Sequence, residues 1–161
     1  MYKKYSVLAA IRDFCNLMND NFQKCYSMSE NVTIDEQLPA FRGRFCGVVY
    51  MSSKPTKYGI KHFALVDSVT YYLQKFEVYV GVQPDGPSKL PSDTESLVKR
   101  LIEPISRTGR NVTMDIWFTS VPLAKTLLDE HMLTMVGRYT EKKQARNSKV
   151  FLTRKNMRVD F

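Results

Sequence analysis

The 161-residue sequence has few of the residues that build disulfide frameworks or zinc sites. Its three cysteines, Cys15, Cys25 and Cys46, form an odd and scattered set, which favours reduced thiols over paired ones. The two histidines, His62 and His131, do not lie at zinc-ligand spacing. These scarcities argue against a disulfide-stabilised secreted domain and against a zinc centre.

Long apolar runs are also lacking. No run approaches the ~18 residues that a membrane span needs, so we expect no membrane association. The first residues, 1–13, lack the apolar segment and small-residue cleavage site of a secretory signal. We therefore expect a nuclear or cytoplasmic protein. In those compartments Asn31 and Asn111 are poor glycan acceptors, although each begins an Asn-x-Thr sequon.

Positive charge, in contrast, is in excess. The chain has 24 Lys and Arg against 16 Asp and Glu, a formal charge of +8. Such a surplus attracts polyanions, of which nucleic acid is the commonest inside cells, although solubility alone would also account for it. The hydrophobic content of 43% is enough to build a core, and the length fits one domain or part of a larger one.

The order of periodic segments predicts an α/β fold. Apolar residues three and four positions apart predict a helix over residues 5–26, and Ser92 with Glu95 forms a capping box that predicts a second helix. The expected strands are 32–35, 61–67, 71–80, 111–115 and 133–139, with a further one in 150–161. The expected helices are 5–26, 93–102 and 121–131. The expected connections are a basic loop over 37–60 and a loop over 81–92. Mixed order of this kind predicts one sheet with helices on both faces.

Two nearly identical phrases, NVTID at 31–35 and NVTMD at 111–115, each end on an aspartate. In an extended strand the alternate residues point to opposite faces, so each phrase fits a strand with an acid at its far end. Carboxylates that converge there can hold Mg²⁺ or Mn²⁺. Aspartate is also common in the turn after a strand, and spacing alone favours that interpretation.

Longer stretches around these phrases carry a family resemblance. They are NVTIDEQLPAFRGR (31–44), SKPTKYGIKHFALVDS (53–68) and GRNVTMDIWFTSVPLAKTLL (109–128), preceded by AAIRDFCNLMNDNFQKCYSMSE (9–30) and followed by LTMVG (133–137). Taken in this order, they resemble the piggyBac family of DNA transposases and their domesticated relatives. The resemblance implies a ribonuclease-H-like fold and a metal-dependent site of three aspartates that cuts transposon ends and joins them to a TTAA target.

On this resemblance, Asp35 matches the first catalytic aspartate and Asp115 the second, with Mg²⁺ or Mn²⁺ as the cofactor. We expect residues 1–161 to be a partial catalytic domain, truncated before its end, with a lead-in helix (5–26), a core (31–140) and a poorly matched tail (141–161). The twin phrases are then two adjacent strands that deliver the metal ligands.

The sequence departs from the family pattern in ways that affect activity. No third aspartate stands in family context: Asp160 does not match, and Asp129, Glu130 and Glu141 are expected to be solvated surface charges. Ile116 stands where the family usually has asparagine. Two carboxylates supply too few oxygens to hold two divalent ions, so we expect at most one weakly held ion and no strand transfer by this chain alone.

The remaining candidates concern DNA. The resemblance places five cations near the DNA path, Arg42, Arg44, Lys54, Lys57 and Lys61. Contacts of this kind to phosphates would be independent of sequence, and a solvated loop face is an equal alternative. We expect Trp117 and Phe118 to pack in a turn, and Asp67 to be a turn residue.

Three functions stay open: a transposase-like domain inactive alone, a domesticated non-catalytic DNA-binding module, and a transposon remnant without function. The sequence also leaves open whether the protein forms a homodimer.

Overall fold

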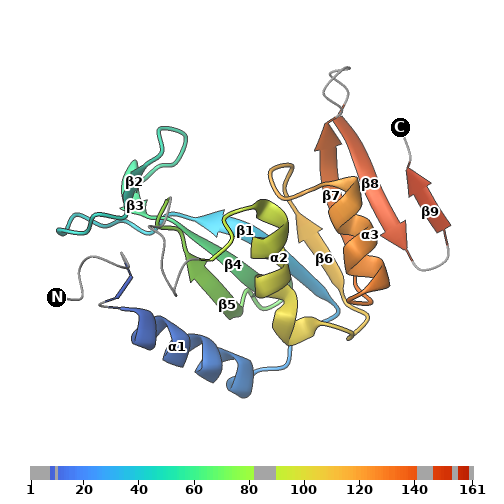
Figure 1. The fold of residues 1–161 in the computed structure, drawn as a ribbon, viewed down its shortest axis with the longest axis horizontal. Coiled ribbons are helices and arrows are strands. Elements are labelled where there is room, and N and C mark those ends of the chain that lie inside the picture. Colours follow the sequence, from blue (N-terminus) through green and yellow to red (C-terminus); the bar gives the residue numbers. More distant parts are fainter. Residues whose placement is uncertain (1–7, 10, 82–89, 141–146, 154–155, 160–161) are drawn as a thin grey trace.

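The structure is a computed structural model that describes residues 8–9, 11–81, 90–140, 147–153 and 156–159, with the backbone alone from Tyr139 onward (Figure 1). Its elements, in chain order, are α1 (Arg12–Cys25), β1 (Asn31–Gln37), β2 (Val48–Tyr50), β3 (Tyr58–Ile60), β4 (His62–Asp67), β5 (Leu73–Val78), α2 (Thr94–Ile102), a 3-10 turn (Glu103–Ile105), β6 (Asn111–Met114), α3 (Val121–Asp129), β7 (Thr134–Thr140), β8 (Asn147–Thr153) and β9 (Asn156–Val159). None of the helices in these ranges has the length and apolar character that crossing a membrane requires.

The main sheet has seven strands in the order β5-β4-β1-β6-β7-β8-β9 (Figure 1). Strand β6 runs parallel to both β1 and β7, while β4, β5, β8 and β9 are each antiparallel to the strand they join. The links from β1 to β6 and from β6 to β7 carry α2 and α3, as parallel neighbours require a crossover. The predicted mixed α/β sheet flanked by helices is confirmed.

The core lies between this sheet and the helices α2 and α3. Along β1, Val32 and Ile34 are fully buried, whereas Thr33 is half-buried and Asp35 is exposed. Helix α2 buries four apolar side chains and α3 buries three, and both sets belong to one cluster with the buried residues of β1, β4 and β6. The alternation in β1 therefore gives the sheet one packed face and leaves Asp35 on the other face.

Helix α1 covers the outer edge of β5 rather than the middle of the sheet. The side-chain amide of Asn19 donates to the carbonyl of Phe76 (3.0 Å) and accepts from its N–H (2.9 Å), which satisfies backbone groups at the strand edge. The Tyr72 hydroxyl donates to the Phe22 carbonyl (3.0 Å). Helices α2 and α3 pack into the core, whereas no residue of α1 is buried. The helices expected on both faces are therefore α2 and α3 over the core and α1 at the β5 edge.

Three sequence-based predictions need correction. The segment 37–60 is more than a loop, because β2 and β3 form a second, two-stranded sheet within it. Strands of three residues are too short for a two-residue period to show. The cap of α2 is Asp93, whose carboxylate accepts from the Ser96 N–H (2.8 Å), and Ser92 lies one residue outside it. The tail holds two strands, β8 and β9, where one was expected.

Candidate functional site

The two predicted aspartates come directly after the last paired residues of two neighbouring parallel strands. Strands β1 and β6 pair in parallel from Asn31 opposite Asn111 to Ile34 opposite Met114, so the next position in register places Asp35 beside Asp115. Paired positions on neighbouring strands are about 4.8 Å apart. Both aspartates are exposed. The prediction that the twin phrases form adjacent strands is confirmed.

Matching residues of the two phrases share register positions and similar burial. Val32 and Ile34 are buried beside Val112 and Met114, each pair sharing a register position. At the start of the strands, the Asn111 amide donates to the side-chain oxygen of Asn31 (3.4 Å). Both sequon asparagines thus belong to the strand ladder.

Local hydrogen bonds set the backbone around each aspartate. The Asp35 carboxylate accepts from the N–H of Glu36 (2.7 Å). The Asp115 carbonyl accepts from the Phe118 N–H (3.0 Å) and the Thr119 hydroxyl (2.9 Å), which forms the turn from β6 into α3. This turn packs so closely on β7 that a Cβ atom at Gly137 would collide with the Thr119 hydroxyl.

Glu36, the residue after Asp35, is held by two lysines. Its carboxylate lies 2.6 Å from the Lys61 ammonium and 3.6 Å from the Lys54 ammonium. The Lys61 ammonium also lies 5.0 Å from the ring centroid of Phe63 and 5.5 Å from that of Trp117, whose rings stack at 5.2 Å and 6°. This lysine–aromatic cluster (Glu36, Lys61, Phe63, Trp117) joins β1, β4 and the turn after β6. Trp117 packs as expected, although 51% of it remains exposed.

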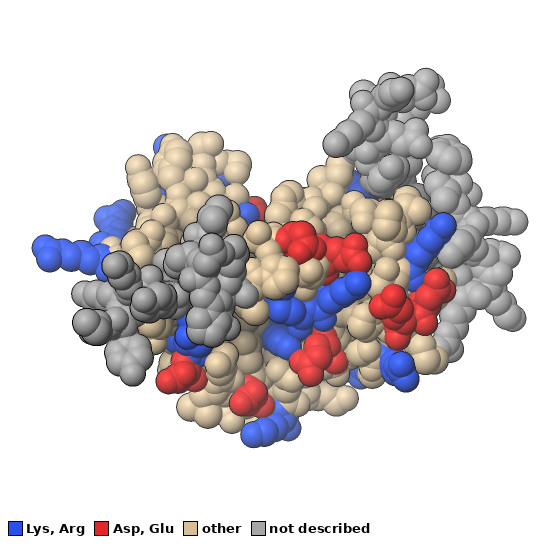
Figure 2. All heavy atoms as spheres, viewed as in Figure 1, with Lys and Arg blue, Asp and Glu red and all other residues tan. Residues whose placement is uncertain are grey.

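Four of the five predicted DNA-binding cations lie on one segment, and the fifth, Lys61, follows it. Residues 38–60, hereafter the arm, carry Arg42, Arg44, Lys54 and Lys57 and no Asp or Glu. The arm holds β2 and β3 and projects beyond the end of the main sheet (Figure 1). Lys and Arg side chains extend from this end of the molecule (Figure 2).

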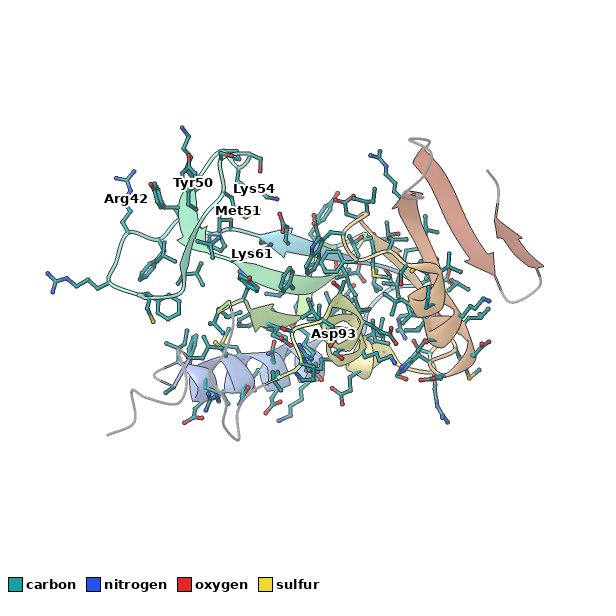
Figure 3. The ribbon with its side chains drawn as sticks, turned by 45° about the horizontal axis from the view of Figure 1, so that its top comes forward. Arg42, Tyr50, Met51, Lys54, Lys61 and Asp93 are labelled. Carbon is teal, nitrogen blue, oxygen red and sulfur yellow. The ribbon has the colours of Figure 1, made fainter. Side chains whose placement is uncertain are left out.

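Exposure differs among these cations. Arg42, Arg44 and Lys57 are exposed, and no ion pair joins them to a carboxylate within the described ranges. Arg42 projects outward, and Lys54 lies on the side of the arm nearer β1 (Figure 3), where it meets Glu36. The Lys61 side chain is only 15% exposed and is engaged within the cluster. Arg42, Arg44 and Lys57 are therefore best placed to meet an external polyanion, whereas Lys54 and Lys61 are engaged with Glu36.

Comparison with known proteins agrees with this geometry. The family model described as Transposase IS4 matches residues 3–160. This chain belongs to that transposase family. A cryo-EM structure of the piggyBac transposase synaptic complex with hairpin DNA is similar at 38% sequence identity and a TM-score of 0.75, over 88% of this chain and 29% of that chain. No curated protein matches.

This chain is therefore related to piggyBac transposases and has the catalytic-domain fold that the family resemblance implied. It spans 29% of the length of the piggyBac transposase in that complex. The roles of Asp35, Asp115 and the five cations stay predictions, because the comparisons concern the fold and the family.

The donor set of this transposase domain suits one hard cation. Carboxylate oxygens are the ligands that Mg²⁺ and Mn²⁺ prefer, and Asp35 and Asp115, which follow the paired residues Ile34 and Met114, could supply them. Within the described part of the chain, no group of three or more His, Cys, Asp and Glu side chains is placed to hold a metal ion. Asp129 and Glu130 are exposed at the end of α3, whereas Glu141 and Asp160 lie outside the described residues.

Asp67 has a structural role at the opposite end of β4. Its fully buried carboxylate accepts from the N–H groups of Ser29 (2.6 Å), Val69 (2.8 Å) and Thr70 (3.0 Å). Burial acts to raise the pKa of Asp67, but these hydrogen bonds outweigh it and hold the pKa well below its usual range. The predicted turn residue therefore also ties the segment before β1 to the β4–β5 turn.

Neither histidine resembles a metal ligand. The Nε2 atom of His62 lies 3.0 Å from the side-chain oxygen of Gln37, and burial lowers the pKa of His62. The Nδ1 atom of His131 lies 2.9 Å from the Ser106 hydroxyl. Each imidazole has a polar partner that accounts for its position.

Proposed function

We propose that this transposase-family chain supplies two metal-binding carboxylates, Asp35 and Asp115, of a DNA-cleaving site and binds DNA through its arm. The observation that carries the proposal is the parallel register of β1 and β6, which makes the two aspartates neighbours. Family membership supports it, since the related structure is a transposase complex with DNA. A chain of this function would work in the nucleus.

Asp35 and Asp115 would hold one Mg²⁺ or Mn²⁺ ion, which when bound would polarise a phosphate oxygen and orient a water molecule. The fixed register of β1 and β6 sets the spacing of the carboxylates before any cation arrives. The lysine–aromatic cluster positions the end of β1 against the turn that carries Asp115. The chain's own contribution would thus be two carboxylates carried by neighbouring strand ends.

We expect the chain by itself to be inactive in DNA cleavage. Two carboxylates offer too little charge to hold two divalent ions close together. Ile116, which is 41% exposed beside Asp115, adds no polar group there. We expect DNA binding without strand transfer when the chain is tested alone.

The arm would contact phosphates along the DNA backbone. Arg42, Arg44 and Lys57 are exposed, and Lys54 is half-buried at the side of the arm near β1. Neutralising three phosphates, one for each exposed cation, gives a logarithmic salt dependence with a slope of about −2.7 for duplex DNA. Such contacts set affinity and orientation without selecting a sequence.

A second candidate is a non-catalytic DNA-binding module. Among the described residues no group of three or more His, Cys, Asp and Glu side chains is placed to hold a metal ion, which favours this candidate. On this alternative the arm binds DNA in the same way, but affinity does not respond to divalent cations or to changes at either aspartate.

Fluorescence anisotropy with a labelled duplex tests the DNA-binding part. We expect the double variant Arg42→Ala/Arg44→Ala to bind at least 10-fold more weakly and to lower the salt slope by about 2. The matched control is Lys24→Ala/Lys125→Ala, which removes two exposed cations from α1 and α3. Equal affinities of the arm variant and the control would contradict the proposal.

Plasmid nicking with Mn²⁺, Mg²⁺ or chelator tests the chemical part. The expected result is no nicking by the chain alone. Mn²⁺-dependent nicking that is lost in Asp35→Asn and Asp115→Asn, but kept in Asp129→Asn, would support the site and refute the expected inactivity. Nicking that persists in both aspartate variants would refute the site.

A further inference from the structure

Two tyrosines of the arm form an exposed aromatic pair. Tyr50 on β2 and Tyr58 on β3 occupy opposite positions in the small antiparallel sheet. Their ring centroids lie 4.9 Å apart with a 50° angle between the planes. Yet Tyr50 is 55% exposed and Tyr58 is 58% exposed. The arm therefore presents two aromatic surfaces to solvent.

Holding the small sheet together does not require this exposure. The other cross-strand pair on the same face, Val48 with Ile60, is half-buried and packs as expected for a structural pair. Phe41 and Phe45 pack edge to face at 6.4 Å and are half-buried as well. These four apolar side chains of the arm are half-buried, whereas both tyrosines are exposed.

The charge around the pair indicates what it could bind. Lys57 directly precedes Tyr58, and Arg42, Arg44 and Lys54 complete an arm that has no acidic residue. Figure 3 shows Tyr50 on the same arm as Arg42 and Lys54. Exposed aromatic rings beside a cationic path are what proteins use to bind unpaired nucleotides, because the rings stack on bases while the cations contact phosphates.

We propose that Tyr50 and Tyr58 form a stacking platform for an unpaired base of a DNA strand that runs along the arm. The inference rests on the proposed DNA binding, and it adds a preference for strands with unpaired nucleotides. Because Lys54 of the arm is joined to Glu36, the residue after Asp35, the platform is tethered to the end of β1 that carries the candidate metal ligand.

The test uses the full chain and two matched DNA probes that carry 2-aminopurine, one fully paired and one with the fluorescent base unpaired in a short gap. Stacking quenches 2-aminopurine fluorescence. We expect wild-type protein to quench the unpaired probe and to bind it more tightly than the paired one. Loss of one stacking contact should weaken binding to the unpaired probe roughly 5-fold to 100-fold.

Variants locate the effect. Tyr50→Leu and Tyr58→Leu should lose affinity for the unpaired probe and keep their affinity for the paired probe, whereas Tyr50→Phe should keep both. Tyr71→Leu is the control, because Tyr71 is 81% exposed in the turn at the opposite end of β4.

Each outcome has one meaning. No quenching by wild-type protein that still binds the paired probe would overturn the platform and leave the proposed function intact. Failure to bind either probe would overturn the proposed DNA binding itself. Full quenching of the unpaired probe by folded Tyr50→Leu and Tyr58→Leu would also overturn the platform. If one leucine variant unfolds the arm, the other is compared with wild type and Tyr50→Phe, and absence of quenching by wild-type protein still overturns the platform.

Discussion

Replacing Asp67 should destabilise the fold more than any exposed acid of this chain. The carboxylate is fully buried and accepts three backbone N–H groups at 2.6, 2.8 and 3.0 Å. Hydrogen bonds to a charged group contribute about 1.5–3 kcal/mol each, but they are not additive, and water can enter the site in a variant. We expect Asp67→Ala to lower the free energy of unfolding by about 3–5 kcal/mol.

Asp67→Asn keeps one acceptor oxygen and should lower the free energy of unfolding by roughly 2 kcal/mol. Urea denaturation followed by circular dichroism measures both variants, with Asp20→Ala, which changes an exposed acid of α1, as the control. The control should stay within about 0.5 kcal/mol of wild type. A loss below about 1 kcal/mol in Asp67→Ala would refute the claim that this carboxylate joins the segment before β1 to the β4–β5 turn.

The pH dependence gives a second check on the same carboxylate. Its pKa is lowered in the folded protein, so its contribution to stability is fully present above the unfolded pKa of about 3.9. The contribution is lost as the pH falls from there through the folded pKa. The difference between wild type and Asp67→Asn should be constant from about pH 5 to 8 and should shrink in acid. A difference that grows in acid would contradict the assignment.

Two further substitutions test the contacts around the candidate site. Lys61→Met should destabilise the protein by about 2 kcal/mol, since Glu36 loses its close partner, and should shift the fluorescence of Trp117, whereas Lys61→Arg should restore most of both. Unchanged fluorescence in Lys61→Met would contradict the cluster. Gly137→Ala should cost about 1–3 kcal/mol because the new Cβ collides with Thr119, and adding Thr119→Ala should recover part of it in thermal denaturation. If Thr119→Ala recovers none of the lost stability, the collision with Thr119 is not the cause of the destabilisation.

Much of the sheet could be predicted from local patterns. Val32 and Ile34 alternate with Thr33 and Asp35, and this two-residue period is what a half-buried strand produces. The family resemblance predicted what periodicity cannot supply, namely that the strands of the two phrases are neighbours. The hairpin of β4 and β5 could be predicted in the same way, because both strands are six residues long.

The arm shows where local patterns fail. Strands β2 and β3 have three residues each and lie among prolines and glycines, so turn signals outweighed strand signals. The opposition of Tyr50 and Tyr58 depends on that pairing and could not be predicted without it. The same holds for Lys61 and Glu36, which are 25 positions apart in the sequence and meet only in the folded sheet. Lys61, a candidate DNA contact in the sequence, is thus engaged with the Glu36 carboxylate.

Calorimetric titration of Mn²⁺ into wild type, Asp35→Asn, Asp115→Asn and the double variant tests the central claim most directly. If the two carboxylates share one cation, wild type should bind one weak equivalent, either single variant should lose nearly all of it, and the double variant should lose no more. Asp129→Asn should bind as wild type does. Independent, additive losses in the two single variants, or full binding in the double variant, would contradict a shared site.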